Sequence, residues 1–438
     1  MLMRRGLPQA RAFTAKAACC SACFLLIVLP AIASAGTYSG GSGEPNDPFR
    51  ISTPEDLNDI GNHEDHWDKH FILDGDVNLA SYTGVQFNLI GGPYDDCFAG
   101  VFDGNDHTIA NFTFTSPDSN FVGLFVSTCD ECVIRNLRLQ NVRVSGNDII
   151  GGLVGVNRGT ISRCYGAGSV SGNQMVGGVV GLSFGSLVDC SADASVLALE
   201  YETGGLVGRN SGEILGCSTS GVVDGNYTTG GVVGENRGTI LRSYSNGSVC
   251  GDGVIGGLVG RNMVFHSAGM ISCCFAGGTV KGDVSLGGLV GWNANGTITD
   301  CYASADVSGN AFVGGLVGDG GRGAILYSHA VGNVSGSSKT GGLIGGRYKD
   351  SVVTSSFWDT QTTCQVTSDG GTSKTTAQMQ IMSTFADAGW DFIEVWDIGE
   401  NQTYPFIRTY LAGDINHDGV VDFRDITHLA ADWLGGVE

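Results

Sequence analysis

The chain has 438 residues, and 71 of them are glycine, about twice the usual share for a soluble protein. Only 8 residues are proline and 15% are charged, while 42% are hydrophobic, which excludes collagen-like and disordered chains. The formal net charge of −21 repels nucleic acid and anionic membrane surfaces, so we expect neither as a partner.

Residues 1–35 have the features of an export signal. Four basic residues precede an apolar run that ends at Ala33-Ser34-Ala35, the pattern of a signal-peptidase site. The run is about a dozen residues long, too short to span a bilayer, and we expect no membrane span elsewhere. The sequence therefore predicts a secreted, extracellular or cell-surface protein. Without residues 1–35, the chain has 19 basic and 44 acidic residues.

Residues 36–97 predict an N-terminal cap. Thr53 can cap a helix that starts at Pro54, with acids in its first turn, and the helix should end near Gly61. The apolar runs 71–73 and 77–79 predict strands that enter the first coils. A cap is physically required because the end of a solenoid exposes unpaired strand edges.

The pentapeptide Gly-Gly-(Leu/Val)-(Val/Ile)-Gly recurs eight times, at intervals of 26 to 31 residues. The copies begin at Gly151, Gly177, Gly204, Gly230, Gly256, Gly287, Gly314 and Gly341. Two degenerate copies precede them, at 98–102 and 121–125. Each period holds three short apolar pieces rich in β-branched residues, separated by Gly, Asn or Ser, and none is long enough for a helix.

One such unit cannot bury its apolar face alone, whereas stacked units form a continuous core. The sequence therefore predicts an all-β fold: a parallel β-helix, or β-solenoid, of about ten coils over residues 98–357, with three short strands per coil. A β-propeller is the second possibility, but its blades usually need 40–50 residues. The handedness of the coil stays open, and we expect a monomer.

Aligned copies place equivalent residues in columns. The first column is aliphatic: Ile161, Leu187, Ile214, Ile240, Ile271, Ile298, Ile325 and Val353. Three residues later the column is Cys164, Cys190, Cys217, Ser243, Cys274, Cys301, Ser328 and Ser356. We interpret these cysteines as small buried side chains, with disulfides between adjacent coils as the less favoured alternative. Eleven cysteines remain after residue 35, an odd number that cannot all pair.

A third column is rich in asparagine: Asn157, Ser183, Asn210, Asn236, Asn262, Asn293 and Asp319. Asparagine tolerates positive φ at a turn and can hydrogen-bond to its neighbour in the next coil. We favour a structural ladder over a row of ligand-binding groups.

The full copy Gly-Gly-Leu-Val-Gly-x-Asn-x-Gly-x-Ile resembles the GLUG-motif family of bacterial secreted and surface proteins, over residues 98–357. The resemblance implies an extracellular role in adhesion or scaffolding. Residues 358–411 resemble the tail that often ends GLUG arrays. The helical start at Thr375 and the aromatic residues that follow predict a C-terminal cap with an aromatic plug.

The strongest chemical motif lies in residues 412–438. Oxygen ligands recur with the spacing of an EF-hand loop, and Gly419 stands at the position of its sharp turn. The predicted Ca²⁺ ligands are Asp414, Asn416, Asp418, the Val420 carbonyl, Asp422 and Asp425. The apolar spacing from Ile426 to Leu434 predicts a helix directly after the loop. A solvated acidic turn is the alternative.

Aspartate in place of glutamate at Asp425 makes this segment similar to a dockerin repeat. The resemblance implies a cohesin-like protein or surface scaffold as partner, and an extracellular polysaccharide as a further one. A full dockerin has two such loops and this segment has one, which puts binding to a cohesin in doubt. The helix could instead dock on the solenoid cap through Trp433.

Other motifs match catalytic or metal-binding patterns only superficially. Gly181–Gly185 and Gly318–Gly323 match G-x-S-x-G and G-x-G-x-x-G, but both follow the repeat and no helix is expected after them. Cys129-Asp-Glu-Cys132 is a single Cys-x-x-Cys motif without a second one. We interpret it as a local disulfide or free thiols rather than a zinc site. His63-Glu-Asp-His66 lacks the H-E-x-x-H spacing and is interpreted as a solvated acidic face.

Two further segments deserve mention as possible sites on the solenoid. Residues 103–107 contain clustered acids of the kind that carbohydrate-active enzymes use, although a turn between strands is favoured. The long insertion Arg261–Gly269, which contains His266, is the first place to look for a site. We expect a non-enzymatic adhesion or scaffold protein, with a carbohydrate-active β-helix hydrolase or lyase, or a glycan-binding module, as alternatives.

Overall fold

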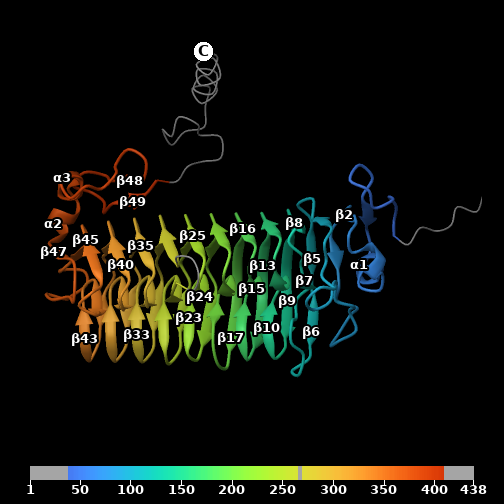
Figure 1. The fold of residues 1–438 in the computed structure, drawn as a ribbon, viewed down its shortest axis with the longest axis horizontal. Coiled ribbons are helices and arrows are strands. Elements are labelled where there is room, and N and C mark those ends of the chain that lie inside the picture. Colours follow the sequence, from blue (N-terminus) through green and yellow to red (C-terminus); the bar gives the residue numbers. More distant parts are fainter. Residues whose placement is uncertain (1–37, 265–268, 409–438) are drawn as a thin grey trace, which may run out of the picture. The chain divides into compact units, whose positions relative to one another are not determined.

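The computed structural model describes residues 38–264 and 269–408, which form a parallel β-solenoid of about 11 turns, as the repeat predicts. Figure 1 shows the coils stacked in chain order, with helices only near the two ends of the described part. In one coil the strands are β10 (Asp148–Gly151), β11 (Val154–Asn157), β12 (Thr160–Ser162) and β13 (Tyr165–Gly172).

The coils from Asp148 onward contain four or five strands, whereas residues 98–147 contribute the predicted three strands per coil. The Gly-Gly pair supplies one extra corner: a Cβ on Gly151 would lie 2.1 Å from the Val154 carbonyl oxygen. Only glycine therefore allows the chain to turn directly from β10 into β11. In later coils the fourth side also divides into two short strands, such as β26 (Tyr244–Ser245) and β27 (Ser248–Cys250).

Strands at equivalent positions pair in parallel from coil to coil and build the sheets. The twelve-stranded sheet consists of β1 (Phe49–Ile51), β2 (His70–Leu73), β4 (Val101–Asp103), β8 (Val133–Arg135), β12, β16 (Ser186–Val188), β20 (Glu213–Leu215), β25 (Thr239–Leu241), β30 (Met270–Ser272), β35 (Thr297–Thr299), β40 (Ala324–Leu326) and β45 (Val352–Thr354). The eight-stranded sheet consists of β10, β14 (Gln174–Gly177), β18 (Thr203–Gly204), β23 (Thr228–Gly230), β28 (Val254–Gly256), β33 (Val284–Gly287), β38 (Ala311–Gly314) and β43 (Ser338–Gly341). The nine-stranded sheet consists of β7 (Phe125–Ser127), β11, β15 (Val180–Ser183), β19 (Val207–Asn210), β24 (Val233–Asn236), β29 (Val259–Asn262), β34 (Val290–Asn293), β39 (Val317–Asp319) and β44 (Ile344–Gly346). A fourth sheet begins with short strands such as β3 (Val77–Asn78), continues with long ones such as β13, and ends with short ones such as β26.

The aliphatic column lies in the core, as predicted. Ile161 pairs with Leu187, and Leu187 pairs with Ile214, so the three side chains are stacked neighbours. All three are fully buried. Because each side chain packs on the next coil, the core is continuous along the stack.

The column of cysteine and serine is also buried, with at most 2% of any residue exposed. These side chains do more than fill space, because several accept a backbone hydrogen bond from the preceding coil. The N–H of Cys217 donates to Ser243 Oγ at 3.1 Å, and the N–H of Cys274 donates to Cys301 Sγ at 3.4 Å. The column cysteines are free thiols, so the disulfide alternative is wrong for them.

The asparagine column forms the predicted hydrogen-bonded ladder. The Asn210 amide donates to Asn236 Oδ1 at 2.9 Å, and Asn236 donates to Asn262 in the same way. Two details differ from the prediction. These asparagines do not have positive φ; the left-handed residues stand instead just before the cysteine column, as at Arg163.

The second difference concerns Asp319, which pairs with Trp292 and not with Asn293. The Asn293 amide donates instead to the Ala324 carbonyl, so the ladder ends there. In this repeat Gly320 stands where most other repeats have asparagine. The sequence alignment therefore placed Asp319 in the asparagine column, one residue away from its true position.

The N-terminal helix α1 (Pro54–Ile60) has the expected bounds. Thr53 accepts from the N–H of Asp56, and the Asp56 carboxylate accepts from the N–H of Thr53, a reciprocal capping box. The short 3₁₀ helix η1 (Glu64–His66) follows. Residues 36–97 also contain β1 and β2, which pair with each other and continue into β4.

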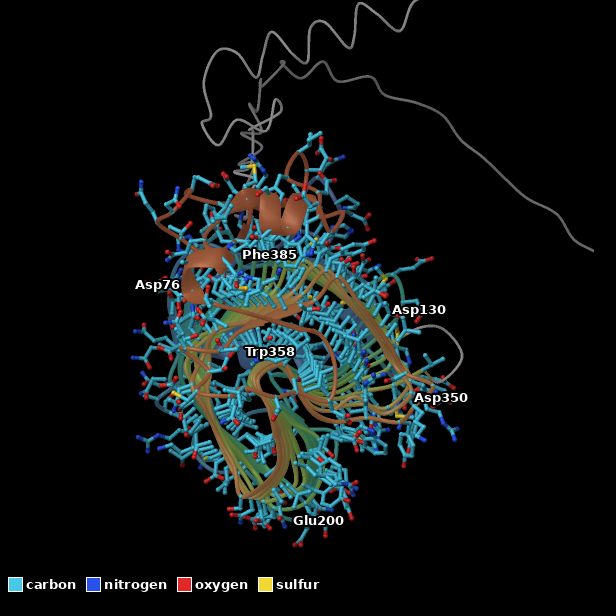
Figure 2. The ribbon with its side chains drawn as sticks, turned by 90° about the vertical axis from the view of Figure 1, so that its left-hand side faces the viewer. Asp76, Asp130, Glu200, Asp350, Trp358 and Phe385 are labelled. Atoms are coloured by element: carbon cyan, nitrogen blue, oxygen red, sulfur yellow. A yellow bond between two sulfur atoms is a disulfide. The ribbon has the colours of Figure 1, made fainter. Side chains whose placement is uncertain are left out.

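The chain from β46 (Phe357–Asp359) onward has two parts. Trp358 belongs to the main core, and Figure 2 shows it inside the outline of the coil. The helices α2 (Thr376–Met379) and α3 (Met382–Ala386) and strands β48 (Trp396–Asp397) and β49 (Phe406–Ile407) follow. They enclose a separate aromatic cluster against the outside of the last coils, in which His329 Nε2 lies 3.0 Å from the Pro405 carbonyl oxygen.

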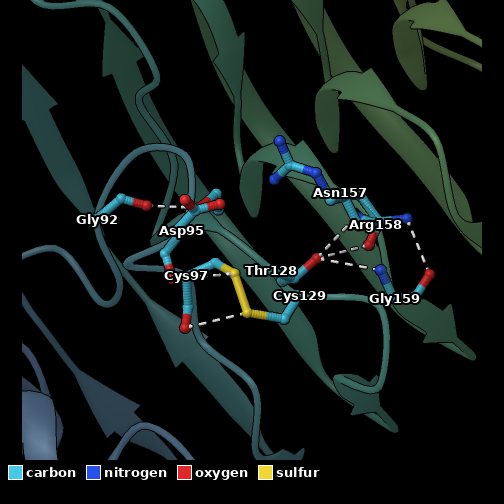
Figure 3. The surroundings of a disulfide bond; sticks show 9 residues. Gly92, Asp95, Cys97, Thr128, Cys129, Asn157, Arg158 and Gly159 are labelled. Carbon is cyan, nitrogen blue, oxygen red and sulfur yellow. Dashed lines mark hydrogen bonds between the residues drawn. A yellow bond between two sulfur atoms is a disulfide. The ribbon is translucent and has the colours of Figure 1, made fainter.

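One disulfide joins neighbouring coils, between Cys97 and Cys129 (Figure 3). The sequence does not predict it, because Cys97 belongs to no motif. Cys129 thus bonds outside its Cys-x-x-Cys pair, while Cys132 stays a free, buried thiol whose pKa burial raises. Within residues 38–264 and 269–408, no helix is long and apolar enough to cross a membrane.

Candidate functional site

A groove runs along the outside of the solenoid where the eight-stranded and nine-stranded sheets meet. One part of it, about 470 Å³, is lined by Tyr227, Asp252 and Trp292, among others. The next part, about 530 Å³, is lined by side chains that include Phe312 and Asp369. Asp319 lines both parts, so the two hollows adjoin, and together they define what we call the groove.

Glycines explain why a groove forms at this place. A Cβ on Gly318 would lie 2.6 Å from the backbone nitrogen of Leu286, and a Cβ on Gly345 would lie 2.6 Å from the Phe312 carbonyl carbon. The two sheets therefore contact each other through their backbones, with no room for side chains between them. The larger side chains at neighbouring positions line the groove instead.

A single column of the nine-stranded sheet leads into the groove, and its last two members, Trp292 and Asp319, line it. Arg209 of β19 pairs with Glu235 of β24, which pairs with Arg261 of β29. Arg261 pairs with Trp292 of β34, which pairs with Asp319 of β39. The column thus changes along the stack from an ionic section to an aromatic and acidic one.

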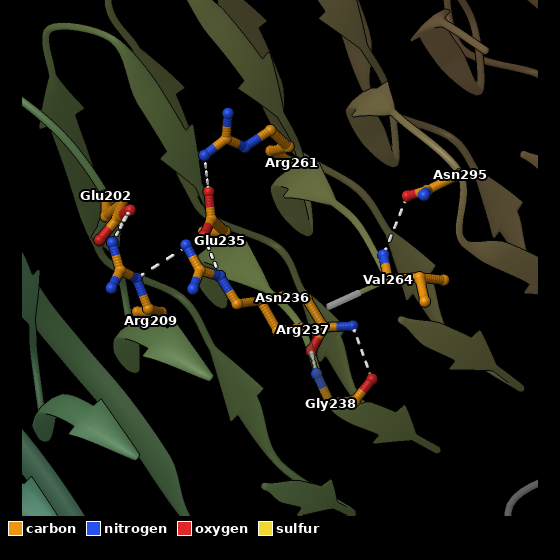
Figure 4. Close-up of polar contacts among 9 residues, drawn as sticks. All are labelled: Glu202, Arg209, Glu235, Asn236, Arg237, Gly238, Arg261, Val264 and Asn295. Atoms are coloured by element: carbon orange, nitrogen blue, oxygen red, sulfur yellow. Dashed lines mark hydrogen bonds and ion pairs between the residues drawn. The ribbon is translucent and has the colours of Figure 1, made fainter. Parts of the chain in front are cut away.

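The ionic section is built around Glu235, which is fully buried (Figure 4). Arg237 Nε lies 2.5 Å from its carboxylate, Arg261 donates to its other oxygen, and Arg209 Nε lies 3.6 Å away. Arg209 also pairs with the buried Glu202. Burial lowers the pKa of the Arg261 guanidinium, although Glu202 opposes this effect. A buried charge of this kind is tolerated only because several partners compensate it.

The acidic section centres on Asp319. Partial burial raises the pKa of Asp319, and the negative charge of Asp369 raises it further, whereas the Gly321 N–H and Lys339 oppose the shift. The Gly321 N–H donates to Asp319 Oδ1 at 2.8 Å. The Lys339 ammonium lies 3.9 Å from the centre of the Phe312 ring, so charged and aromatic groups alternate here too.

Aromatic faces beside carboxylates suit a particular class of ligand. A sugar ring presents an apolar C–H face to an aromatic side chain and hydroxyl groups to hydrogen-bond acceptors. Sites for such amphipathic molecules combine apolar walls with a few placed polar groups. The groove also extends along successive coils. It therefore suits a polymer with repeating units better than a single small molecule.

The predicted Ca²⁺ ligands Asp414, Asn416, Asp418, Val420, Asp422 and Asp425 lie outside the described residues, as does His266. Ser183 is buried, and its Oγ accepts from the Asn157 amide at 3.2 Å, which fits the dismissal of a nucleophile there. Strands and not helices follow the two motifs directly: β16 follows Gly185 and β40 follows Gly323.

Residues 103–107 form a turn between β4 and β5 (Thr108–Ala110), as favoured. Partial burial alone would raise the pKa of Asp103, but hydrogen bonds from Asn136, the Asn105 N–H and Arg135 lower it below its ordinary value. The groove residues belong to no motif that predicts a site. A usable signal was present: the position that holds Val156 and Leu182 in earlier coils holds charged residues, Trp292 and Asp319 in later ones.

Comparison with known proteins gives the following matches. The family model of the GLUG motif matches residues 282–308. Halomucin of Haloquadratum walsbyi is 34% identical over 140 residues, which cover 31% of this chain and 2% of halomucin. A protein provisionally named a Gly-rich membrane protein, from Evansella cellulosilytica, is 42% identical over 80 residues, or 17% of this chain and 9% of that protein.

A crystal structure from Bacteroides ovatus, of a protein provisionally named an immunoglobulin A1 protease, is similar with a TM-score of 0.43. Its sequence identity is 19%, and the match covers 85% of this chain and 96% of that one. The chain's own fold and the family match show a β-solenoid repeat protein with the GLUG motif, which spans only a small fraction of the curated relatives it matches.

Proposed function

We propose that this GLUG-repeat solenoid is a secreted or cell-surface, non-enzymatic protein for adhesion and scaffolding, and that its groove holds an extracellular polysaccharide. The observation that carries the proposal is the junction of the two hollows at Asp319, between Trp292 on one side and Phe312 on the other. Consecutive aromatic and carboxylate positions along the stack can contact consecutive sugar units of one chain.

Three further observations support the location and the attachment. Two relatives bear the names of a halomucin and a membrane protein, which fits a protein at the cell surface. Residues 1–35 have the pattern of an export signal. The acidic loop from Asp414 to Asp425 has the ligand spacing of a calcium site, and we propose that this dockerin-like tail joins the protein to a cohesin-like partner or polysaccharide-handling assembly.

The test of the groove is retention of the purified chain on a panel of immobilised polysaccharides. Trp292→Ala should lower the affinity for the retained polysaccharide about five- to thirty-fold, because a stacked aromatic contributes about 1–2 kcal/mol. Phe184→Ala is the matched control: Phe184 is an exposed aromatic on the solenoid that lines neither hollow. Equal retention of both variants and the wild type would show that the groove is not the binding surface.

A glycoside hydrolase is the second candidate, and one observation favours it. Asp319 has a raised pKa and shares a hollow with Asp369, and paired carboxylates with separated pKa values catalyse glycoside hydrolysis. The retained polysaccharide should be incubated with wild type and with Asp319→Asn, and reducing ends measured. Sugar release that disappears in Asp319→Asn would replace the scaffold proposal with this one.

A further inference from the structure

A second candidate site lies far from the groove in the sequence, in the turn after α1. His63 precedes η1, and His66 is its last residue. The two histidines are three positions apart, which on an α-helix is not the i, i+4 spacing of a zinc-binding H-E-x-x-H. His63, directly before η1, has a non-helical backbone (φ −117°, ψ 77°), and the tight turn that follows brings its ring beside that of His66. The local conformation therefore brings together side chains whose spacing argued against a site.

The geometry of this cluster is that of a possible coordination sphere. Potential ligand atoms of His63, Asp65 and His66 all lie within 4.8 Å of one another. His63 Nδ1 is 3.9 Å from Asp65 Oδ1, and His66 Nε2 is 3.8 Å from Asp65 Oδ2. The two imidazole rings are stacked, with centroids 5.0 Å apart and an interplanar angle of 25°.

His66 is held in place by groups that do not belong to the cluster. Tyr38 Oη lies 3.1 Å from His66 Nδ1, and the Phe49 ring centre lies 4.9 Å from that of His66. Only 19% of the His66 side chain is exposed. When Tyr38 accepts the Nδ1 proton, the lone pair of His66 is on Nε2, on the side of Asp65. A hydrogen bond at the second ring nitrogen orients metal-binding histidines in this way.

We propose that His63, Asp65 and His66 bind one Zn²⁺ ion. Two imidazole nitrogens and one carboxylate oxygen form a donor set that suits zinc, whereas Ca²⁺ and Mg²⁺ prefer oxygen ligands alone. Zinc bonds of about 2.0–2.2 Å place ligand atoms roughly 3.3 Å apart, so the pairs must close by roughly 0.5–1.5 Å. The half-exposed His63 and the exposed Asp65 have the freedom to make that movement.

Zn²⁺ binding would link the turn after α1 to Tyr38, because Tyr38 hydrogen-bonds to His66. This end of the solenoid carries β1, the end strand of the twelve-stranded sheet. An ion that binds only the folded turn stabilises it by mass action. The acids Glu64 and Asp68 beside the cluster add negative charge that favours a cation. This inference is independent of the polysaccharide proposal.

The experiment is a calorimetric Zn²⁺ titration of the full chain in excess calcium, which occupies oxygen-only sites. We expect one site in the wild type and a loss of affinity of at least about tenfold in His63→Gln, Asp65→Asn and His66→Gln. His107→Gln is the matched control, because His107 Nδ1 lies 3.6 Å from Asp76 Oδ1 but has no second histidine in its cluster. Its affinity should equal that of the wild type.

A second measurement locates the ion without any substitution. Diethylpyrocarbonate modification followed by mass spectrometry should show that Zn²⁺ protects His63 and His66 and leaves His107 reactive. Circular dichroism of each apo variant reports whether it folds. Unchanged zinc affinity in the folded His63→Gln and His66→Gln variants, or modification of both histidines at saturating zinc, would overturn the proposal.

Discussion

The backbone N–H of Cys190 donates a hydrogen bond to Cys217 Sγ, 3.4 Å away in the next coil. The same arrangement recurs with a serine oxygen as acceptor, for example from Cys301 to Ser328. The sulfur atom therefore satisfies a buried donor at a corner of the coil, and serine can do the same. Burial also raises the pKa of the Cys217 thiol well above its ordinary value.

This relationship predicts unequal effects of two substitutions at one position. Cys217→Ser keeps an acceptor and should change the free energy of unfolding by less than about 1 kcal/mol, whereas Cys217→Val leaves the Cys190 N–H unpaired and should cost about 1–3 kcal/mol. Urea unfolding followed by tryptophan fluorescence measures both. Cys364→Ser is the control, because Cys364 is exposed. Equal stability of the serine and valine variants would contradict the hydrogen-bonding role.

The ionic section of the column, around Glu235, predicts a large effect of a small change. Glu235→Gln removes the negative charge that compensates Arg209, Arg237 and Arg261, and should destabilise the solenoid by about 3–5 kcal/mol. Glu213→Gln, on the exposed face of β20, should change stability by less than about 0.5 kcal/mol. Comparison of the two urea midpoints checks this, and similar midpoints would show that the network contributes little.

His329 predicts how the C-terminal aromatic cluster responds to acid. Complete burial lowers the pKa of His329 to about 4, although the Pro405 carbonyl opposes the shift. The unfolded chain, with the ordinary pKa of 6.5, then binds more protons than the folded one between pH 6.5 and 4. Stability is therefore full above pH 6.5 and falls by about 1.4 kcal/mol per pH unit below it.

The measurement is the thermal midpoint of Trp390 and Trp396 fluorescence at several pH values from 7.5 to 4.5, since both rings lie near His329. His329→Phe keeps an aromatic ring between Tyr302 and Phe357 and should flatten this pH dependence. An equally steep dependence in His329→Phe would assign the proton uptake to another group.

The calcium loop remains a prediction from the sequence, and one substitution tests it. Asp418→Ala removes a carboxylate ligand and should lower the affinity for Ca²⁺ at least about tenfold in calorimetry of the full chain. The Glu213→Gln variant provides a matched loss of one negative charge elsewhere. Capture of a partner by the wild type should also disappear in chelator. Undiminished calcium affinity in Asp418→Ala would favour the solvated acidic turn.

Sequence periodicity was most informative where every coil repeats the same contact. It predicted the stacking of Ile161 on Leu187 and the asparagine ladder. The capping residue Thr53 separately predicted the helix that starts at Pro54. Periodicity was less informative at corners: the number of strands per coil depends on backbone turns at glycine pairs. The one-residue displacement of Asp319 concealed its place beside Trp292, and with it the groove.

The sequence by itself determined the solenoid, because a unit of 26 or 27 residues with one apolar face can bury that face only against copies of itself. Only the tertiary structure decided which unlike residues meet. Cys97 bonds to Cys129 across 32 positions, and His329 contacts Pro405 across 76. Such partners depend on how coils register and how the ends fold back, and neither is encoded in local spacing. The same reason applies to His63 and His66, whose rings stack because of the tight turn through η1.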